Sequence, residues 1–298
     1  MKNIINCAFL LALAATAPVM GQDYLIPVNS ATNGATCGAP PFAVVAQTAG
    51  YVSCSRAGYF HWFAVGGGWS TAFTLSNPTG SDMYIQATLL DQSGNTVGAM
   101  SMTRNGTSLG TKSSDAVLLP KNGSLRYQLP NSGAANETNG QILVQVLAKS
   151  GLSLQSVVAT EDYTYTSSAG IVYSTVTLPI AWVDAAQTTY SATFEESSAD
   201  SSLGAFAVKD VSGSAQTVDA KAYDVNGTQL AEKTISLTAG QVVAATSDSL
   251  FGATTFQALS PSPIARVQFT GTGLIDVLVL QVRGQSLASM PATSVLTQ

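Results

Sequence analysis

The side chains of this chain that could do acid–base or nucleophilic chemistry are few. His61 is the only histidine among 298 residues, so a serine-hydrolase triad would need it as the base, and no G-x-S-x-G turn is present. The pairs Glu161-Asp162 and Glu195-Glu196 offer carboxylates of the kind that glycosidases use. Adjacent residues on a strand point to opposite faces, so neither pair can act together. We therefore predict no catalytic residues and no enzyme.

Three segments could suggest a metal or phosphate site. Asp and Asn oxygens gather at residues 91–95 and 224–227, but the EF-hand spacing with its distal Glu is missing. An Asp followed by a Gly is what a short turn requires. The glycine run at residues 66–68 has no Gly-Lys-Ser/Thr after it, so it is not a phosphate loop. We predict turns at the two acidic segments and a flexible or bulged entry to the Trp69 strand at the glycine run, with neither a metal nor a cofactor.

The best binding candidates are aromatic. Residues 59–63 read Tyr-Phe-His-Trp-Phe, and Trp69 follows the glycine run. Alternate residues of a strand face opposite sides, so some of these rings belong to the core and others are covered or exposed. Tyr59, Trp62 and Trp69 are our candidate ligand-facing aromatics, and core packing is the alternative. Stacking on sugar rings would require two of them to lie coplanar on one face.

The N-terminus predicts secretion. Residues 1–21 contain Lys2, an apolar run at residues 7–17, and small residues before a cleavage point that would leave Gln22 first. The apolar run is too short for a permanent transmembrane helix, and an uncleaved anchor is the alternative. We expect a protein that is extracellular, on the cell surface or periplasmic, with no membrane span after cleavage.

Signal cleavage would remove Cys7 and leave two cysteines, Cys37 and Cys54. In an oxidising compartment, two remaining cysteines predict a disulfide between them. Such a bond would stabilise the protein by roughly 3 kcal/mol in the chain-entropy description, which suits a poorly cored extension at residues 22–58. A redox-active pair is the alternative, but the C-x-x-C spacing is absent.

The composition limits the partners. Only 10% of residues are charged, and 12 basic against 17 acidic residues give a net charge of −5. The chain has no basic footprint for nucleic acid, and an anionic membrane surface would repel it. We expect an unknown protein or glycan surface partner.

Alternating strands must position the candidate residues. At residues 65–95 we predict one β-hairpin, in which Phe73 and Leu75 face one way and Ile85, Ala87 and Leu89 alternate with polar neighbours. Both strands are predicted to be half-buried and antiparallel.

The same pattern recurs later in the chain. Without gaps, residues 72–94 align with residues 205–227, and the in-out phase agrees throughout. A slip of one residue would reverse every face, so preserved phase is a stronger sign than the few identities. Downstream, residues 119–123 align with 237–240 as turns, and residues 144–146 align with 267–269.

This repeat predicts the architecture. We expect an all-β protein with two tandem antiparallel, immunoglobulin-like β-sandwich domains after the signal peptide. The expected segments are the signal at 1–21, the disulfide-clipped extension at 22–58, and the two sandwich domains at 59–178 and 179–298.

The order of motifs resembles a repeated domain of uncharacterised bacterial secreted and cell-surface proteins. It runs from Gly-Gly-Gly-Trp-Ser-Thr at residues 66–71 through Asn77-Pro78 and residues 89–95 to the Leu-Pro-x-x-Gly turn at 119–123. The resemblance covers residues 60–292 and implies tandem immunoglobulin-like sandwiches, an extracellular location and no known catalytic residues. The second copy departs from the pattern, with Asp-Val at residues 210–211 in place of Asn-Pro, which argues against two equivalent binding sites.

Together these observations favour a secreted, non-catalytic surface, adhesion or matrix interaction module. The alternative is a carbohydrate-binding module that uses exposed aromatics of the first domain.

Overall fold

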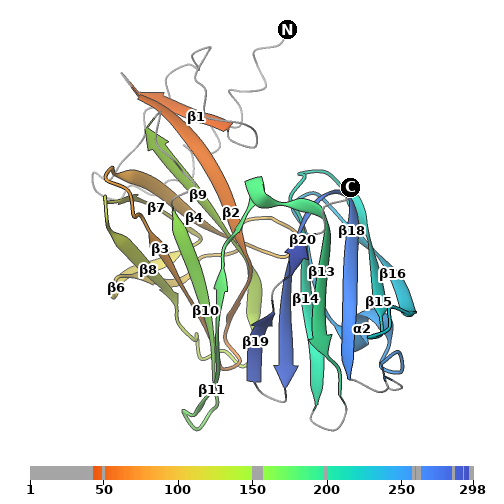
Figure 1. Ribbon diagram of the computed structural model, residues 1–298. Helices are drawn as coiled ribbons and strands as arrows, with labels where there is room; N and C mark the ends of the chain where they lie inside the picture. The colour runs from red at the N-terminus through yellow and green to blue at the C-terminus, as the bar shows by residue number, and fades with distance from the viewer. Residues whose placement is uncertain are drawn as a thin grey trace.

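A computed structural model describes residues 43–48, 51–149, 157–197, 201–256, 259, 263–283, 286–290 and 292–294. The chain is nearly all β, and antiparallel sheets pack face to face (Figure 1). The predicted all-β sandwich class is confirmed. The expected signal peptide and Cys37 lie outside the described residues, and so does the side chain of Cys54, although its backbone belongs to a strand.

Residues 43–182, here called the first unit, form two six-stranded sheets. One sheet has the order β1-β2-β9-β4-β7, with β12 also on β2, and the other has the order β11-β10-β3-β8-β5-β6. The strands are β1 (Ala43–Thr48), β2 (Tyr51–Val65), β3 (Trp69–Ser76), β4 (Met83–Leu90), β5 (Met100–Arg104), β6 (Thr107–Lys112), β7 (Ser114–Leu119), β8 (Ser124–Leu129), β9 (Thr138–Lys149), β10 (Val158–Thr166), β11 (Val172–Pro179) and β12 (Ala181–Trp182).

Residues 187–294, here called the second unit, form one eight-stranded sheet that folds over itself. The strands are β13 (Gln187–Glu195), β14 (Ser202–Asp210), β15 (Gln216–Tyr223), β16 (Gln229–Leu237), β17 (Val242–Thr246), β18 (Ile264–Arg283), β19 (Ser286–Met290) and β20 (Thr293–Ser294). The first part of β18 pairs with β13 and β15, and its last part pairs with β14 and β19. Two short helices, η2 (Val183–Ala185) and α2 (Ser247–Phe251), complete the described structure.

The two units share one pairing scheme. β3 lies between β10 and β8, just as β14 lies between the last part of β18 and β17. β4 lies between β9 and β7, just as β15 lies between the first part of β18 and β16. The last strand of each unit along the chain also has an equivalent partner. β12 pairs with β2 in the first unit, and β20 pairs with β13 in the second. Strands β1, β5 and β6 have no counterpart among the described strands of the second unit.

Side-chain alternation follows the predicted phase. In β4 the residues alternate between buried and half-buried, with Ile85, Ala87 and Leu89 inside, and β15 repeats the pattern. Because one face of each strand must be removed from water, this alternation fixes which residues form the core. Each unit has its own buried apolar cluster, centred on Phe73 in the first and Phe206 in the second.

The predicted hairpin at residues 65–95 is wrong. β3 and β4 lie in different sheets and do not pair with each other. The link between them crosses from one layer of the sandwich to the other, and Asn77 holds it by donating to the carbonyl oxygens of Ser81, Leu119 and Pro120. Alternation is the same for strands that pair side by side and for strands in facing layers, so it could not distinguish the two arrangements.

One alignment also needs correction. Ala87 of β4 faces Val144, whereas the equivalent Ala220 of β15 faces Phe269. Val144 therefore corresponds to Phe269 and not to Val267. The shift is two residues, and an even shift leaves every side chain on the same face.

Strand pairing also refines the expected boundaries. The boundary between residues 58 and 59 falls inside β2, which pairs with β9 on both sides of that point. The boundary between residues 178 and 179 precedes β12, which still pairs with the first unit. The first unit therefore extends to Trp182, and the second unit begins after it.

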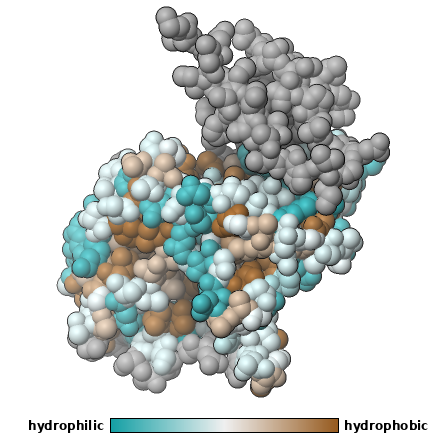
Figure 2. Space-filling view, turned by 180° about the vertical axis from the view of Figure 1, so that it is seen from behind, coloured by the Kyte–Doolittle hydropathy of each residue, from teal (hydrophilic) through white to brown (hydrophobic). Residues whose placement is uncertain are grey.

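The units meet along a seam. β11 and β19, each at a sheet edge, lie side by side there (Figure 1). A third apolar cluster fills the seam, in which Tyr163, Val176 and Leu178 pack against leucines of the second unit. On the back of the molecule, hydrophobic residues lie in separate patches with hydrophilic residues between them (Figure 2).

Candidate functional site

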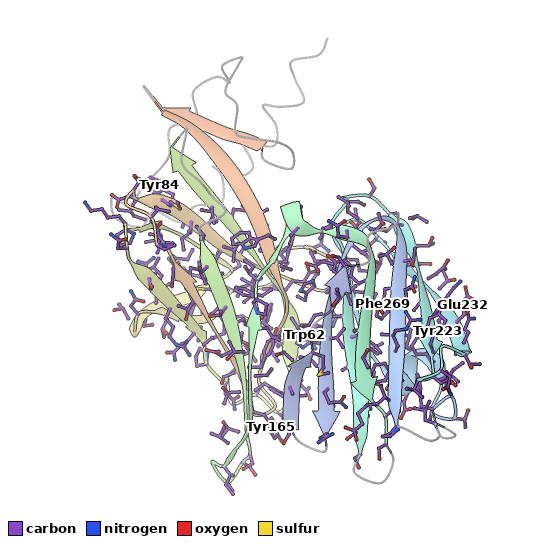
Figure 3. All side chains as sticks on the ribbon, in the orientation of Figure 1. Trp62, Tyr84, Tyr165, Tyr223, Glu232 and Phe269 are labelled. Carbon is purple, nitrogen blue, oxygen red and sulfur yellow. The ribbon has the colours of Figure 1, made fainter. Side chains whose placement is uncertain are left out.

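The aromatic candidates are positioned by an irregularity in β2. The pairing register with β9 shifts between Phe60 and Phe63, so that His61 and Trp62 together oppose Gln141. An extra residue of this kind bends the strand and re-aims its side chains. Phe60 and Phe63 both remain in the core, while Trp62 is only half-buried at the seam (Figure 3).

The glycine run forms the turn that carries Trp69 back beside β2. Gly66 and Trp69 exchange two backbone hydrogen bonds, and all three glycines have positive φ. A Cβ on Gly68 would lie 2.6 Å from the carbonyl oxygen of Thr166, and one on Gly66 would lie 2.5 Å from that of Asn136. Only glycine fits both the conformation and the space. The run is therefore a tight turn, not a loose linker.

A cavity of about 150 Å³ opens between these aromatics and the second unit. Trp62 and Trp69 line it from the first unit, and Leu280 and Leu287 line it from the second. The other described residues that line it are Ala64, Glu137 and Tyr163. We call this space the seam cavity. Glu137 is exposed and marks its solvent side, whereas Tyr163 is buried.

The three candidate rings do not stack on one another. Trp69 packs against Tyr165 with ring centroids 5.0 Å apart and planes tilted by 48°. Among the described residues, no ring contact joins any two of Tyr59, Trp62 and Trp69. The seam cavity thus gathers Trp62 and Trp69 around one space without stacking them.

Below the cavity, Glu161 and Tyr163 form a buried hydrogen-bonded chain. The Tyr163 hydroxyl donates to the carbonyl oxygen of Trp62 and lies 2.6 Å from Glu161 Oε2. The Tyr163 hydroxyl is the donor in both contacts, so its single proton is shared between the two acceptor oxygens. Burial raises the pKa of Glu161 well above its usual value, although the hydrogen bond from Tyr163 opposes the shift. Its other oxygen has no partner among the described residues.

A second polar cluster locks the two units together nearby. Lys209 of β14 is fully buried, and its ammonium group donates to Gln141 Oε1 and to the Gly240 carbonyl oxygen at 2.9 Å. Its Nζ also lies 3.8 Å from the centroid of the Tyr59 ring. Burial lowers the pKa of Lys209 to about 8, although Asp210 opposes the shift.

Gln141 completes this cluster from the first unit. It is fully buried, and its amide donates to the carbonyl oxygens of Asp91 and Gly240 at 3.0 and 3.2 Å. Beside it, the backbone N–H of Val242 donates to the Gln92 carbonyl oxygen at 2.8 Å. The turn that begins at Asp91 therefore docks onto the second unit.

His61 lies at the same junction and is held neutral. Its Nε2 is 3.7 Å from Asp276 Oδ2, yet burial lowers the pKa of His61 despite this carboxylate, and Lys209 adds to the lowering. His61 is 5% exposed. The one histidine available to a hydrolase triad is thus enclosed between the units.

The acidic turns and carboxylate pairs have structural roles. Asp91 Oδ1 accepts from the backbone N–H groups of Ser93 and Asn95, and Asp224 makes the equivalent bonds, so the predicted turns are confirmed. Asp162 points away from Glu161 and accepts from Arg126 at 3.0 Å. Within the described segments, no three His, Cys, Asp or Glu side chains gather as a metal site would require.

No protein-family model and no curated protein matches the chain. In the part of the chain that the structure describes, no helix has the length and apolar character needed to cross a membrane.

Sequence reasoning identified Trp62 and Trp69, which do share one cavity. It placed Tyr59 with them, but the Tyr59 ring is instead covered by Lys209. Lys209 and Gln141 were missed, although a lysine directly after the apolar run of residues 205–208 was a visible signal. The acid at Glu161 was considered only as half of a pair.

Proposed function

We propose that this chain is a secreted, non-catalytic β-sandwich protein that acts as a surface, adhesion or matrix interaction module. The observation that carries the proposal is the burial of the ionisable groups whose pKa values are shifted. Glu161, His61 and Lys209 are 1%, 5% and 0% exposed, and each is enclosed at or near the seam. Catalytic acids and bases need perturbed pKa values in an accessible cleft, so this placement supports a structural role.

The fold suits such a module. Two sandwich units with one pairing scheme share a polar junction and an apolar seam, which presents their outer faces as one extended surface. The net charge of −5 disfavours nucleic acid, and the signal-like N-terminus supports secretion. The partner would be a protein or glycan on a surface.

A carbohydrate-binding function is the second candidate. It is favoured by Trp62 and Trp69 around the seam cavity and by Glu137 at its solvent side. It is weakened because, among the described residues, no ring contact joins any two of Tyr59, Trp62 and Trp69.

Expression of the full chain in a bacterial host tests the first proposal. The mature protein should begin at Gln22, reach the periplasm or medium, and bind a matrix protein or intact cells. Retention in the cytoplasm with its N-terminus intact would contradict secretion.

A glycan array on the purified protein separates the two candidates. Hits that weaken in Trp69→Ala and persist in Trp69→Phe, which keeps a ring, would support carbohydrate binding. Protein binding with a blank array would support the interaction module.

A further inference from the structure

We propose that the seam cavity binds a small organic cation, specifically a quaternary ammonium headgroup. This inference rests on the proposed function of the chain as a binding module, and it assigns a ligand chemistry to one place on that module.

The size of the cavity restricts what can enter. About 150 Å³ is well below the roughly 300–1,000 Å³ of sites for drug-sized ligands, so the space suits a headgroup or the end of a side chain. Any occupant would lie close to Trp62, Trp69 and Tyr163 at the same time. Cations are attracted to aromatic rings within roughly 6 Å of the centroid, and tryptophan is the best such partner.

The charges around the cavity favour a cation. Among the described residues that line it, Glu137 is the only carboxylic acid, and none is a lysine or an arginine. Elsewhere in the described chain, Lys209 lies over Tyr59 and Arg266 lies over Tyr223, at 3.8 and 4.3 Å from the ring centroids. No cation of the described residues occupies the equivalent position over Trp62 or Trp69. The protein thus fills two of its aromatic sites with its own cations and leaves this pair available.

The scarcity of hydrogen-bonding groups argues against a sugar in the same space. The Tyr163 hydroxyl is already engaged by the Trp62 carbonyl oxygen and by Glu161. Glu137 Oε1 accepts from Asn139 at 3.1 Å. A sugar would bury several hydroxyl groups without partners, and each would cost free energy. An alkylated ammonium group has no hydrogen-bond donor to satisfy, so apolar walls with one carboxylate match it.

Isothermal titration of the mature full chain at low salt tests the proposal, with choline as the probe. The matched comparison is 3,3-dimethylbutan-1-ol, which has the same shape without the charge. Choline should bind about tenfold more tightly than the alcohol, the difference expected from a cation between aromatic rings. Methyl glycosides of common sugars form the third arm.

Variants locate the site. Trp62→Ala should weaken choline binding about tenfold, while Trp62→Phe, which retains a ring and guards against simple unfolding, should lose much less. Glu137→Gln should weaken binding by about threefold, as expected for an exposed carboxylate. Glu232→Gln removes an acidic side chain of the second unit, far from the cavity, and should have no effect (Figure 3).

Three results would overturn the proposal: no choline binding, equal binding of choline and its neutral analogue, or choline binding that is unchanged in Trp62→Ala. Binding of a glycoside but not of choline would replace it with the carbohydrate function. If choline fails while the protein still binds a cell surface or matrix protein, the cation proposal falls and the proposed function stands.

Discussion

Individual buried side chains make this molecule sensitive to pH in opposite directions. Lys209 is buried as a base with a lowered pKa, and Glu161 is buried as an acid with a raised pKa. In both cases burial disfavours the charged form and sets the direction of the shift. The two groups lie in different parts of the seam, so their contributions to stability can be measured separately.

For Lys209, the folded pKa of about 8 lies below the ordinary value of 10.5. Between these values the unfolded chain binds more protons, so the free energy of unfolding should rise with pH, by up to about 1.4 kcal/mol per pH unit. Lys209→Met removes the titrating group and should flatten this rise. Urea unfolding from pH 8 to pH 10 measures it, and equal slopes in both proteins would contradict the assignment.

For Glu161, the folded pKa lies well above 4.5, so the folded chain binds more protons once the pH exceeds that value. Stability should therefore fall as pH rises above 4.5, by up to about 1.4 kcal/mol per pH unit until Glu161 ionises. Glu161→Gln removes the titrating group and should lack this loss of stability as the pH rises above 4.5, which urea unfolding at a series of pH values measures. Asp162→Asn, on the opposite face of β10, is the control and should retain the wild-type loss.

Among the elements, alternation predicted individual strands better than it predicted their partners. The inward faces of β4 and β15 follow directly from their apolar spacing. The assignment of β3 and β4 to different sheets depends on what lies beside each strand, and local spacing contains no such information. The two-residue error at Val144 has the same origin, because a period of two cannot detect an even shift.

The turn between β2 and β3 can be tested by single substitutions. Gly68→Ala forces a side chain into φ +96° and places its Cβ 2.6 Å from the Thr166 carbonyl oxygen. We expect the free energy of unfolding to fall by at least about 1–3 kcal/mol, because the backbone strain and the clash with the carbonyl oxygen act together. Gly98→Ala is the matched control, because its Cβ would meet nothing within 4 Å. Equal melting temperatures for the two variants would rule out the turn geometry described here.

At the scale of the whole molecule, the junction could not be predicted from either half alone. Trp62 and Trp69 were found because tryptophan is rare in this sequence, which contains only three. Lys209 and Gln141 acquire their roles only when β14 is placed against the bulge of β2. Their contact depends on the relative position of two units, and neither spacing nor composition encodes that position.

This junction predicts a single cooperative unfolding transition for the chain. Apolar contacts, the buried lysine and the backbone hydrogen bond from Val242 to Gln92 all link the units. Leu280→Asp places a charge in the seam and should split the calorimetric transition into two steps. Val158→Asp, at a position 57% exposed on β10, should keep one transition. Two steps already present in the wild type would show that the seam does not couple the units.

β18 has a mechanical consequence. In the first unit, the positions equivalent to β18 belong to two separate strands, β9 and β10. In the second unit they belong to one continuous strand, β18, which is hydrogen-bonded in both layers. A pull along β18 would load the ladders of both layers in shear at once, because neither can slip in register without the other. If tension reaches this protein along its chain, the second unit should resist it longer than the first.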